Sequence, residues 1–190
     1  MRLLLLGPPG AGKGTQGARL ASVLAVAHIA AGDVLRGEVE RNTETGRRAA
    51  RYLRAGELAP DDLIIDAMTP ALVAAAAQGG YVLDGFPRTE AQASELDRIS
   101  GELGIPLDAA VYLDVPTDEL ERRLLARAEI EGRTDDTPDV IARRLEVFAA
   151  TTRPMIARYE QRGVLVTIDG SRAVDDITSD IRSQLTSRVG

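Results

Sequence analysis

The sequence predicts an α/β protein, with a mainly parallel sheet that helices cover on both faces. Short apolar runs alternate along the chain with segments of helical periodicity, which is typical of this class. Several of these runs are almost wholly apolar and end in Gly or Asp, as expected for strands buried on both faces. A glycine-rich turn directly follows the first run and leads into a helical segment.

The expected strands are short apolar segments spread along the whole chain. They are Arg2–Leu6, a short piece at 28–29, Tyr81–Asp84, Ala109–Asp114 and 164–169. Acidic residues after Pro60 favour a helix N-terminus at that point. A boundary or kink is expected near Pro70 and near Pro154. A closing helix is indicated by apolar residues at intervals of three, four and four: Val174, Ile177, Ile181 and Leu185.

Composition narrows the class of protein further. A chain of 190 residues with 44% hydrophobic and 27% charged residues fits a single globular domain, spanning 1–190, and excludes a disordered or collagen-like chain. The net charge of −6 argues against a nucleic-acid partner. The apolar run at Leu3–Leu6 is far shorter than the ~18 residues of a membrane span, so no membrane partner is expected. A chain without cysteine has no disulfide and no Cys-type zinc site, which favours a cytoplasmic protein but leaves a secreted one open.

The first motif joins the glycine-rich turn to the only lysine of the chain. It reads Gly7-Pro8-Pro9-Gly10-Ala11-Gly12-Lys13-Gly14-Thr15, and Lys13 stands against 22 arginines elsewhere. Glycines let successive backbone N–H groups point inward as an anion cradle, and the next helix adds the partial positive charge of its N-terminus. Lys13 then reaches the β and γ phosphates of a nucleotide, and the Thr15 hydroxyl faces phosphate or metal. The general pattern has Ser or Thr directly after Lys, whereas Gly14 stands there in this chain.

A second motif, Asp84-Gly85-Phe86-Pro87-Arg88, follows another expected strand. The C-terminal edge of a parallel sheet is where such folds bind ligands, so Asp84 and Arg88 are expected there. A carboxylate in that place holds Mg²⁺ through its water shell. An arginine makes bidentate contacts with phosphate. The two motifs together indicate a site for phosphorylated ligands.

These two motifs closely resemble those of the adenylate kinases, within the wider family of nucleoside monophosphate kinases. The resemblance covers nearly the whole chain, because further motifs follow in the family's order. They are Ile29-Ala30-Ala31-Gly32-Asp33-Val34-Leu35-Arg36, then Ala55 to Asp61, then Arg123-Leu124-Leu125-Ala126-Arg127 and Gly132-Arg133-Thr134-Asp135-Asp136. The resemblance implies a P-loop kinase with a five-stranded parallel core that transfers a phosphoryl group from MgATP to AMP and yields two ADP.

The resemblance also assigns roles to residues. The ATP site is expected to comprise Gly10, Ala11, Gly12, Lys13, Gly14, Thr15, Arg127 and Gly170. The AMP site is expected to comprise Ala31, Arg36, Glu57, Leu58, Ala59, Gly85, Phe86, Pro87, Arg88, Gln92, Arg133 and Arg144. The catalytic cations are expected to be Lys13, Arg88, Arg123, Arg133 and Arg144, and Asp84 is the expected ligand of Mg²⁺ through water.

The family carries two mobile parts on its core. They correspond here to a monophosphate-binding segment at 30–59 and to a short lid at 126–137 with the acidic pair Asp135 and Asp136. Long-lid members of the family often hold zinc on a cysteine set in the lid, and this cysteine-free chain is of the short-lid type, so no structural zinc is expected. The family further implies a monomer.

Two residues point to different acceptor bases. Adenylate kinases usually have threonine where this chain has Ala31, and alanine there resembles the uridylate–cytidylate kinases. Gln92 favours AMP, because its amide offers a donor and an acceptor that suit an adenine edge, whereas the pyrimidine kinases usually carry Asn. We weigh Gln92 above Ala31 and expect AMP.

The chemistry requires no general base. A phosphate acceptor is already ionised near neutral pH, since its second pKa is about 6. The one histidine, His28, lies in a short apolar stretch and is expected to be a packed side chain rather than a catalytic one. A nucleotide-sensing module without activity is the non-enzyme alternative, and the full arginine set speaks against it.

Overall fold

The computed structural model describes residues 1–131 and 137–189, and it contains a five-stranded, fully parallel sheet. Its strand order is β2-β3-β1-β4-β5. The strands are β1 (Arg2–Leu6), β2 (Ala27–Ala30), β3 (Tyr81–Asp84), β4 (Ala109–Asp114) and β5 (Leu165–Asp169). Because β1 pairs with both β3 and β4, the segments that follow these three strands emerge side by side at one edge of the sheet.

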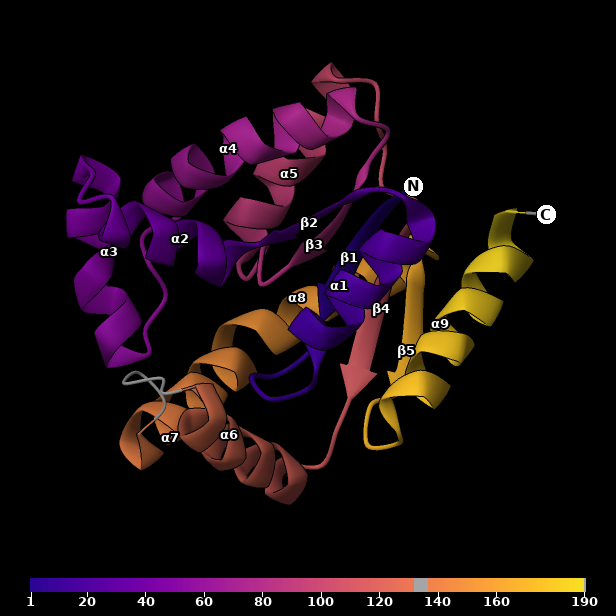
Figure 1. Ribbon diagram of the computed structural model, residues 1–190. Coiled ribbons are helices and arrows are strands. Elements are labelled where there is room, and N and C mark those ends of the chain that lie inside the picture. Colours follow the sequence, from indigo (N-terminus) through magenta and orange to yellow (C-terminus); the bar gives the residue numbers. More distant parts are fainter. Residues whose placement is uncertain (132–136, 190) are drawn as a thin grey trace.

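Helices connect the strands. They are α1 (Lys13–Leu24), α2 (Ala31–Glu40), α3 (Glu44–Ala55), α4 (Asp61–Ala77), α5 (Glu90–Glu102), α6 (Thr117–Glu131), α7 (Pro138–Val147), the π-helical turn η1 (Phe148–Thr152), α8 (Arg153–Gln161) and α9 (Val174–Val189). Figure 1 shows α2 and α3 as an arm on one side of the sheet and α6 with α7 below its C-terminal edge. Both chain ends lie on the side away from the α2–α3 arm, with C at the far end of α9.

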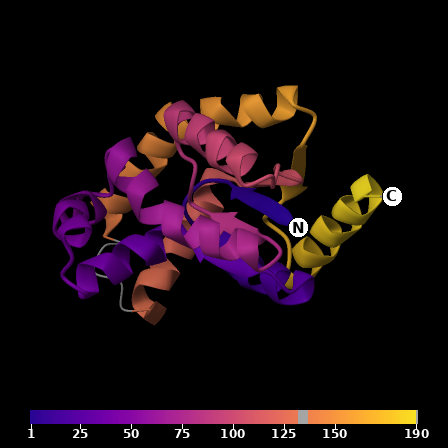
Figure 2. The same cartoon turned by 90° about the horizontal axis from the view of Figure 1, so that it is seen from above.

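Two hydrophobic cores lie on the two faces of the sheet. Alternate residues of β1 point to opposite faces, as the two-residue repeat of a strand requires: Leu4 and Leu6 belong to one core, and Leu3 and Leu5 to the other. Helices α2, α4, α5 and α8 cover the first face, and α1 and α9 cover the second. The view from above in Figure 2 shows the sheet between these helical layers. The predicted fold class is confirmed.

The predicted strands match the observed ones closely, and most helix expectations hold as well. Helix α4 begins at Asp61, directly after Pro60. In α9, Ile177, Ile181 and Leu185 are buried as predicted, while Val174 is exposed.

The helix boundary considered at Pro70 does not occur, because α4 runs through this residue. Proline removes one backbone hydrogen bond. Met68 and Leu72 on either side are fully buried in the core, so tertiary packing keeps the segment helical. At Pro154 the expectation is better met, since α8 begins at Arg153 after the π-helical turn.

The single histidine, His28, belongs to β2 and packs against α1. Its Nε2 atom is buried and has no hydrogen-bond partner among the described residues. The ring lies against Gly17 of α1, where an added Cβ would be 2.3 Å from Nε2. The position of His28 therefore depends on a helix residue without a side chain.

Within the described ranges, 1–131 and 137–189, no helix is both long and apolar enough to cross a membrane.

The contact between Gly17 and His28 predicts that the effect of Gly17→Ala on the free energy of unfolding changes sign when His28 is replaced by alanine. Gly17→Ala should lower the free energy of unfolding by about 1–3 kcal/mol, because the new methyl group overlaps the imidazole. In a His28→Ala background the same change should be neutral or stabilising, since alanine is the better helix former. Urea unfolding of the four proteins measures the effect.

Gly101→Ala in α5 is the matched control, because a Cβ there meets no atom within 4 Å. This substitution should stabilise the protein by about 0.5–1 kcal/mol. Equal destabilisation by Gly17→Ala in both His28 backgrounds would refute the packing explanation.

Candidate functional site

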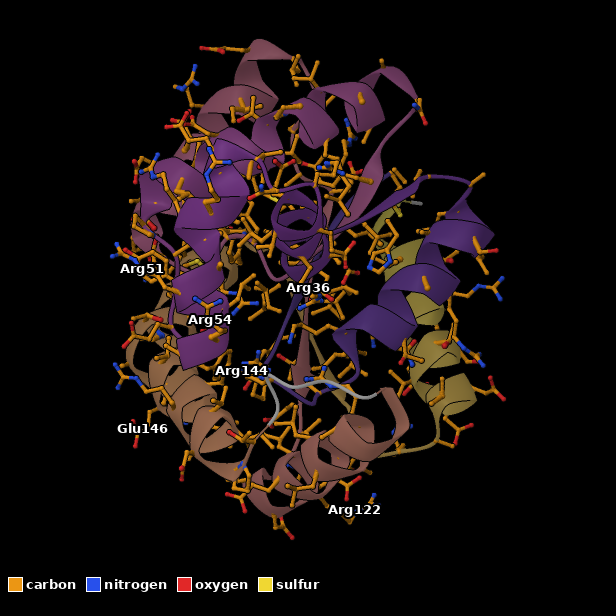
Figure 3. The ribbon with its side chains drawn as sticks, turned by 60° about the vertical axis from the view of Figure 1, so that its left-hand side comes forward. Arg36, Arg51, Arg54, Arg122, Arg144 and Glu146 are labelled. Carbon is orange, nitrogen blue, oxygen red and sulfur yellow. The ribbon has the colours of Figure 1, made fainter. Side chains whose placement is uncertain are left out.

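A cavity of about 1040 Å³ opens at the C-terminal edge of the sheet. Its walls come from the loop after β1, the turn after β3, the arm formed by α2 and α3, and the helices α6, α7 and α9. Figure 3 looks into this opening: Arg36 of α2 and Arg144 of α7 lie toward its middle, whereas Arg122 and Glu146 lie at the outer margin. The volume is at the upper end of the range for small-molecule sites.

The loop after β1 has a backbone conformation that is compatible with an anion cradle. Gly10 and Gly12 have φ angles of 83° and 88°, which L side chains rarely adopt. A Cβ on Gly10 would also lie 2.9 Å from the Leu120 carbonyl oxygen. Helix α1 begins at Lys13, so its N-terminal N–H groups and its partial positive charge face the cavity. Gly10 through Thr15 all line the cavity, as the sequence motif predicts.

The Lys13 ammonium group is folded back onto this loop. Its Nζ donates hydrogen bonds to the carbonyl oxygens of Gly7 and Pro8, each at 2.9 Å. Burial, which disfavours the charged form, lowers the pKa of Lys13 to about 8. The charges of Arg88 and Arg127 lower this pKa further, and the Asp84 carboxylate acts in the opposite direction. Lys13 is therefore a cation held where an anionic ligand would stabilise it.

Arg88 occupies a similar environment, and Asp84 acts on it as well. Burial lowers the pKa of its guanidinium, as do the charges of Arg144 and Arg36, while Asp84 again opposes the shift. Its Nε donates to the Gly85 carbonyl oxygen at 2.7 Å, which fixes the side chain over its own turn. Arg36 donates to Asp33 at 2.5 Å on the same helix and also lines the cavity. The motif after β3 thus meets the loop after β1, as predicted.

The two arginines of α6 contact different parts of the site. Arg123 donates to the carbonyl oxygens of Gly170 and Ser171, at 2.9 and 3.3 Å, and to Glu119 at 2.6 Å. Arg127 is the one whose charge acts on Lys13. Arg123 therefore lies at the β5–α9 loop rather than at the meeting point of the cations. The spacing of four residues predicts one shared helix face but not this division.

Several predicted site residues lie behind the cavity wall. Glu57 and Leu58 line the cavity, as do Gly85 and Pro87. Those that do not line it are Ala31, Ala59, Phe86, Gln92 and Gly170. Gln92 is 2% exposed, and both polar atoms of its amide are bonded to protein groups. Arg133, Asp135 and Asp136 lie outside the described residues.

Sequence reasoning missed the apolar parts of the wall. Leu53, Val147 and Phe148 line the cavity near the α2–α3 arm and α7. Val174 and Ile177 line it at the start of α9, next to Gln16. Their helical spacing assigns them to a buried stripe, yet Val174 is 41% exposed. Because nucleotide bases stack on apolar and aromatic surfaces, these patches have the character expected of base-binding surfaces.

The residues present fit a hydrated divalent cation at Asp84. This carboxylate ends β3, and its Oδ2 lies 3.8 Å from the position of a Cβ built on Gly14. No group of three or more His, Asp or Glu side chains suited to a metal ion occurs in the described part of the chain. A single carboxylate fits Mg²⁺, which keeps several waters and bridges to substrate phosphates.

Comparison with known proteins identifies the family. The sequence profile described as adenylate kinase matches residues 5–164. An adenylate kinase of Kocuria rhizophila is 46% identical over 184 residues, which make up 97% of this chain and 98% of that protein. One from Xylella fastidiosa is 44% identical over 181 residues, covering 95% of this chain and 97% of the relative. One from Xanthomonas euvesicatoria is 43% identical, covering 97% and 99%.

The lowered pKa of Lys13 predicts a pH dependence of nucleotide binding. Phosphates favour the protonated lysine, so binding should weaken as the pH rises through the value of about 8 in the free protein. The dissociation constant of MgATP, measured by calorimetry without a phosphoryl acceptor, should rise about tenfold per pH unit above that value.

Lys13→Met is the control for this titration, and it should bind weakly without an inflection near pH 8. The chain has no cysteine to titrate there, and the Met1 amino group bonds to the Gly79 carbonyl at the other edge of the sheet. An inflection of equal size in Lys13→Met would assign the titration to another group.

Proposed function

Because the chain belongs to the adenylate kinase family, and is a phosphotransferase that converts ATP and AMP into two ADP, we propose that its cavity is divided into a donor side and an acceptor side. The observation that carries this proposal is that the loop after β1 and the turn after β3 direct their cations into one cavity. Two polyanions bound from opposite sides would meet at Asp84.

The donor side binds MgATP. The backbone N–H groups of Gly10 through Thr15 surround the phosphates, and Lys13 moves from the Gly7 and Pro8 carbonyls to the β and γ phosphates. Arg127 adds a second cation to this side. Arg123 donates hydrogen bonds to the Gly170 and Ser171 carbonyl oxygens, so its guanidinium lies at the β5–α9 loop.

The acceptor side binds AMP. Arg36 and Arg88 hold its phosphate, and Leu53, Glu57 and Leu58, which line the cavity, lie beside its base and sugar. Ala59 belongs to the same segment without lining the cavity. We propose AMP rather than CMP or UMP as the acceptor, because the relatives that match nearly the whole chain are adenylate kinases. The buried Ala31 removes one hydroxyl partner, which is worth about 0.5–1.5 kcal/mol, so selectivity for the base should be loose rather than absent.

Transfer then proceeds in line between the two nucleotides. The acceptor oxygen is already ionised near pH 7, so no side chain has to remove a proton. Positive charge must instead be positioned around the phosphoryl group as negative charge spreads over its equatorial oxygens. Arg88, Arg123 and Arg144 supply this charge among the described residues, and Arg133 completes the proposed set.

Magnesium enters as part of the MgATP substrate. Asp84 would hold it through bound water, and the ion would neutralise charge on the β and γ oxygens. The Asp84 carboxylate acts electrostatically on both Lys13 and Arg88, so all three groups lie near the proposed position of the ion.

We propose that residues 30–59 and 126–137 close over the bound nucleotides. The α2–α3 arm already reaches α7: Arg143 lies 3.6 Å from Glu57, and a Cβ on Gly56 would be 2.9 Å from Val140 Cγ1. Closure would exclude water and limit hydrolysis of ATP. A monomer in the cytoplasm, without a structural zinc, remains the proposal that the family resemblance implies.

Lys13→Ala tests the donor side. Loss of a cation that contacts the transferring phosphates should lower kcat by about a thousandfold on a folded protein. A coupled assay of ADP formation with AMP, CMP, UMP and GMP measures both this loss and the choice of acceptor, and AMP should give the highest kcat/KM.

Arg98→Ala is the matched control. Arg98 is an exposed cation that pairs with Glu95 on α5 and does not line the cavity, so its removal should leave turnover unchanged. Wild-type kcat in Lys13→Ala would refute the role of the lysine, and nucleotide binding without ADP formation would support a sensing module instead.

A further inference from the structure

A half-buried carboxylate joins the two chain segments of the acceptor side. Asp61 is the first residue of α4 and follows directly on the segment 57–60. Its Oδ1 accepts hydrogen bonds from Gln92 Nε2 at 2.7 Å and from Thr89 Oγ1 at 3.0 Å. Both donors belong to the start of α5, which follows the turn that carries Arg88. One oxygen atom therefore connects segments that lie about thirty residues apart in the sequence.

The connection continues from Gln92 to the arginine. The Gln92 Oε1 atom accepts the backbone N–H of Arg88 at 2.8 Å. The Thr89 hydroxyl, which donates to Asp61, also accepts the backbone N–H of Gln92 at 3.2 Å. The Arg88 carbonyl oxygen accepts from Thr152 Oγ1 at 3.1 Å, so the main chain of Arg88 is held on both sides.

These contacts fix the orientation of the Gln92 amide. An ionised carboxylate only accepts hydrogen bonds and a backbone N–H only donates, so the NH₂ group must face Asp61 and the oxygen must face Arg88. If the amide were flipped, its oxygen would face the Asp61 carboxylate and its NH₂ group would face the backbone N–H of Arg88, so neither hydrogen bond could form. At 2% exposure, no water replaces the lost partners without a cost.

We propose that Asp61 is a positioning residue for the acceptor phosphate: through Gln92 it holds the Arg88 main chain, and thereby the guanidinium, at the acceptor side. This inference rests on the proposed function, because it takes Arg88 to bind the phosphate of AMP. The Arg88 Nε–Gly85 bond of 2.7 Å ties the side chain to the same turn, so a shift of that main chain moves the guanidinium as well.

A helix-stabilising role for Asp61 predicts a different result. An acidic residue in the first turn interacts favourably with the helix dipole, and Asp62 does so from the same turn. Asp62 is 67% exposed and pairs with Arg48 at 3.3 Å, whereas Gln92 and Thr89 donate to Asp61. Asp62→Ala therefore removes the same charge from the same helix end and leaves the connection to Arg88 in place.

Steady-state kinetics tests the proposal. AMP is varied at saturating ATP in one series, and ATP is varied at saturating AMP in the other. Asp61→Ala should raise the KM for AMP about tenfold, because it removes hydrogen bonds to a charged group. It should leave the KM for ATP within about twofold, and Asp62→Ala should change neither constant. Equal changes in both constants, or an equal effect of Asp62→Ala, would overturn the positioning role.

A charge exchange covers the case in which Asp61→Ala does not fold. Gln92→Glu places two carboxylates against each other and should raise the KM for AMP. Adding Asp61→Asn restores a donor–acceptor pair of the same shape and the same total charge, and should recover most of the loss. Absence of recovery would contradict the proposal.

Failure of this inference is distinguishable from failure of the proposed function. If the wild-type protein forms no ADP from ATP and AMP, the function is wrong. If the wild-type protein does form ADP, but the KM for AMP of the Asp61 variants equals the wild-type value, the proposed function stands and only the positioning role is wrong.

Discussion

The structure depends on one electrostatic constraint: cations must be gathered in a partly dry cleft before the anions that they bind are present. Lys13 and Arg88 both have pKa values lowered by burial and by neighbouring cations, so each is less stable as a charged group than it would be in water. Asp84 is the carboxylate that opposes this effect at both groups. Incoming phosphates supply the missing negative charge and stabilise the charged forms of Lys13 and Arg88, which strengthens phosphate binding. The cleft gathers positive charge although the protein as a whole has a net charge of −6.

The fold satisfies this constraint through the order of its strands. Since β1 lies between β3 and β4, the glycine loop and the Asp84–Arg88 turn leave the sheet as neighbours. The connection after β2 becomes the α2–α3 arm that carries Arg36, and the connection after β4 leads to Arg127 on α6. Each cation is held by a different connection, while the sheet beneath them carries a hydrophobic core on both faces. Connections of this kind can move without disturbing the core.

Sequence reasoning predicts the strands and the glycine loop well, because burial on both faces and backbone conformation constrain local composition directly. The helix boundary that it allows at Pro70 is absent, because buried neighbours outweigh the lost backbone hydrogen bond. Sequence reasoning does not separate Arg123 from Arg127, since their positions depend on how α6 docks against the β5–α9 loop. The network of Gln92 is also hidden from the sequence. An amide that suits an adenine edge suits Asp61 and a backbone N–H equally well, and only three-dimensional structure distinguishes these partners.

The most direct measurement is a crystal structure of the protein with a bisubstrate analogue, two adenosines joined by a chain of phosphates. The account predicts that the phosphate chain crosses the cavity, with Lys13 on one part of it, Arg36 and Arg88 on the other, and Asp84 facing a hydrated magnesium ion between them. A phosphate chain that contacts the glycine loop but lies far from Asp84 and Arg88 would contradict it.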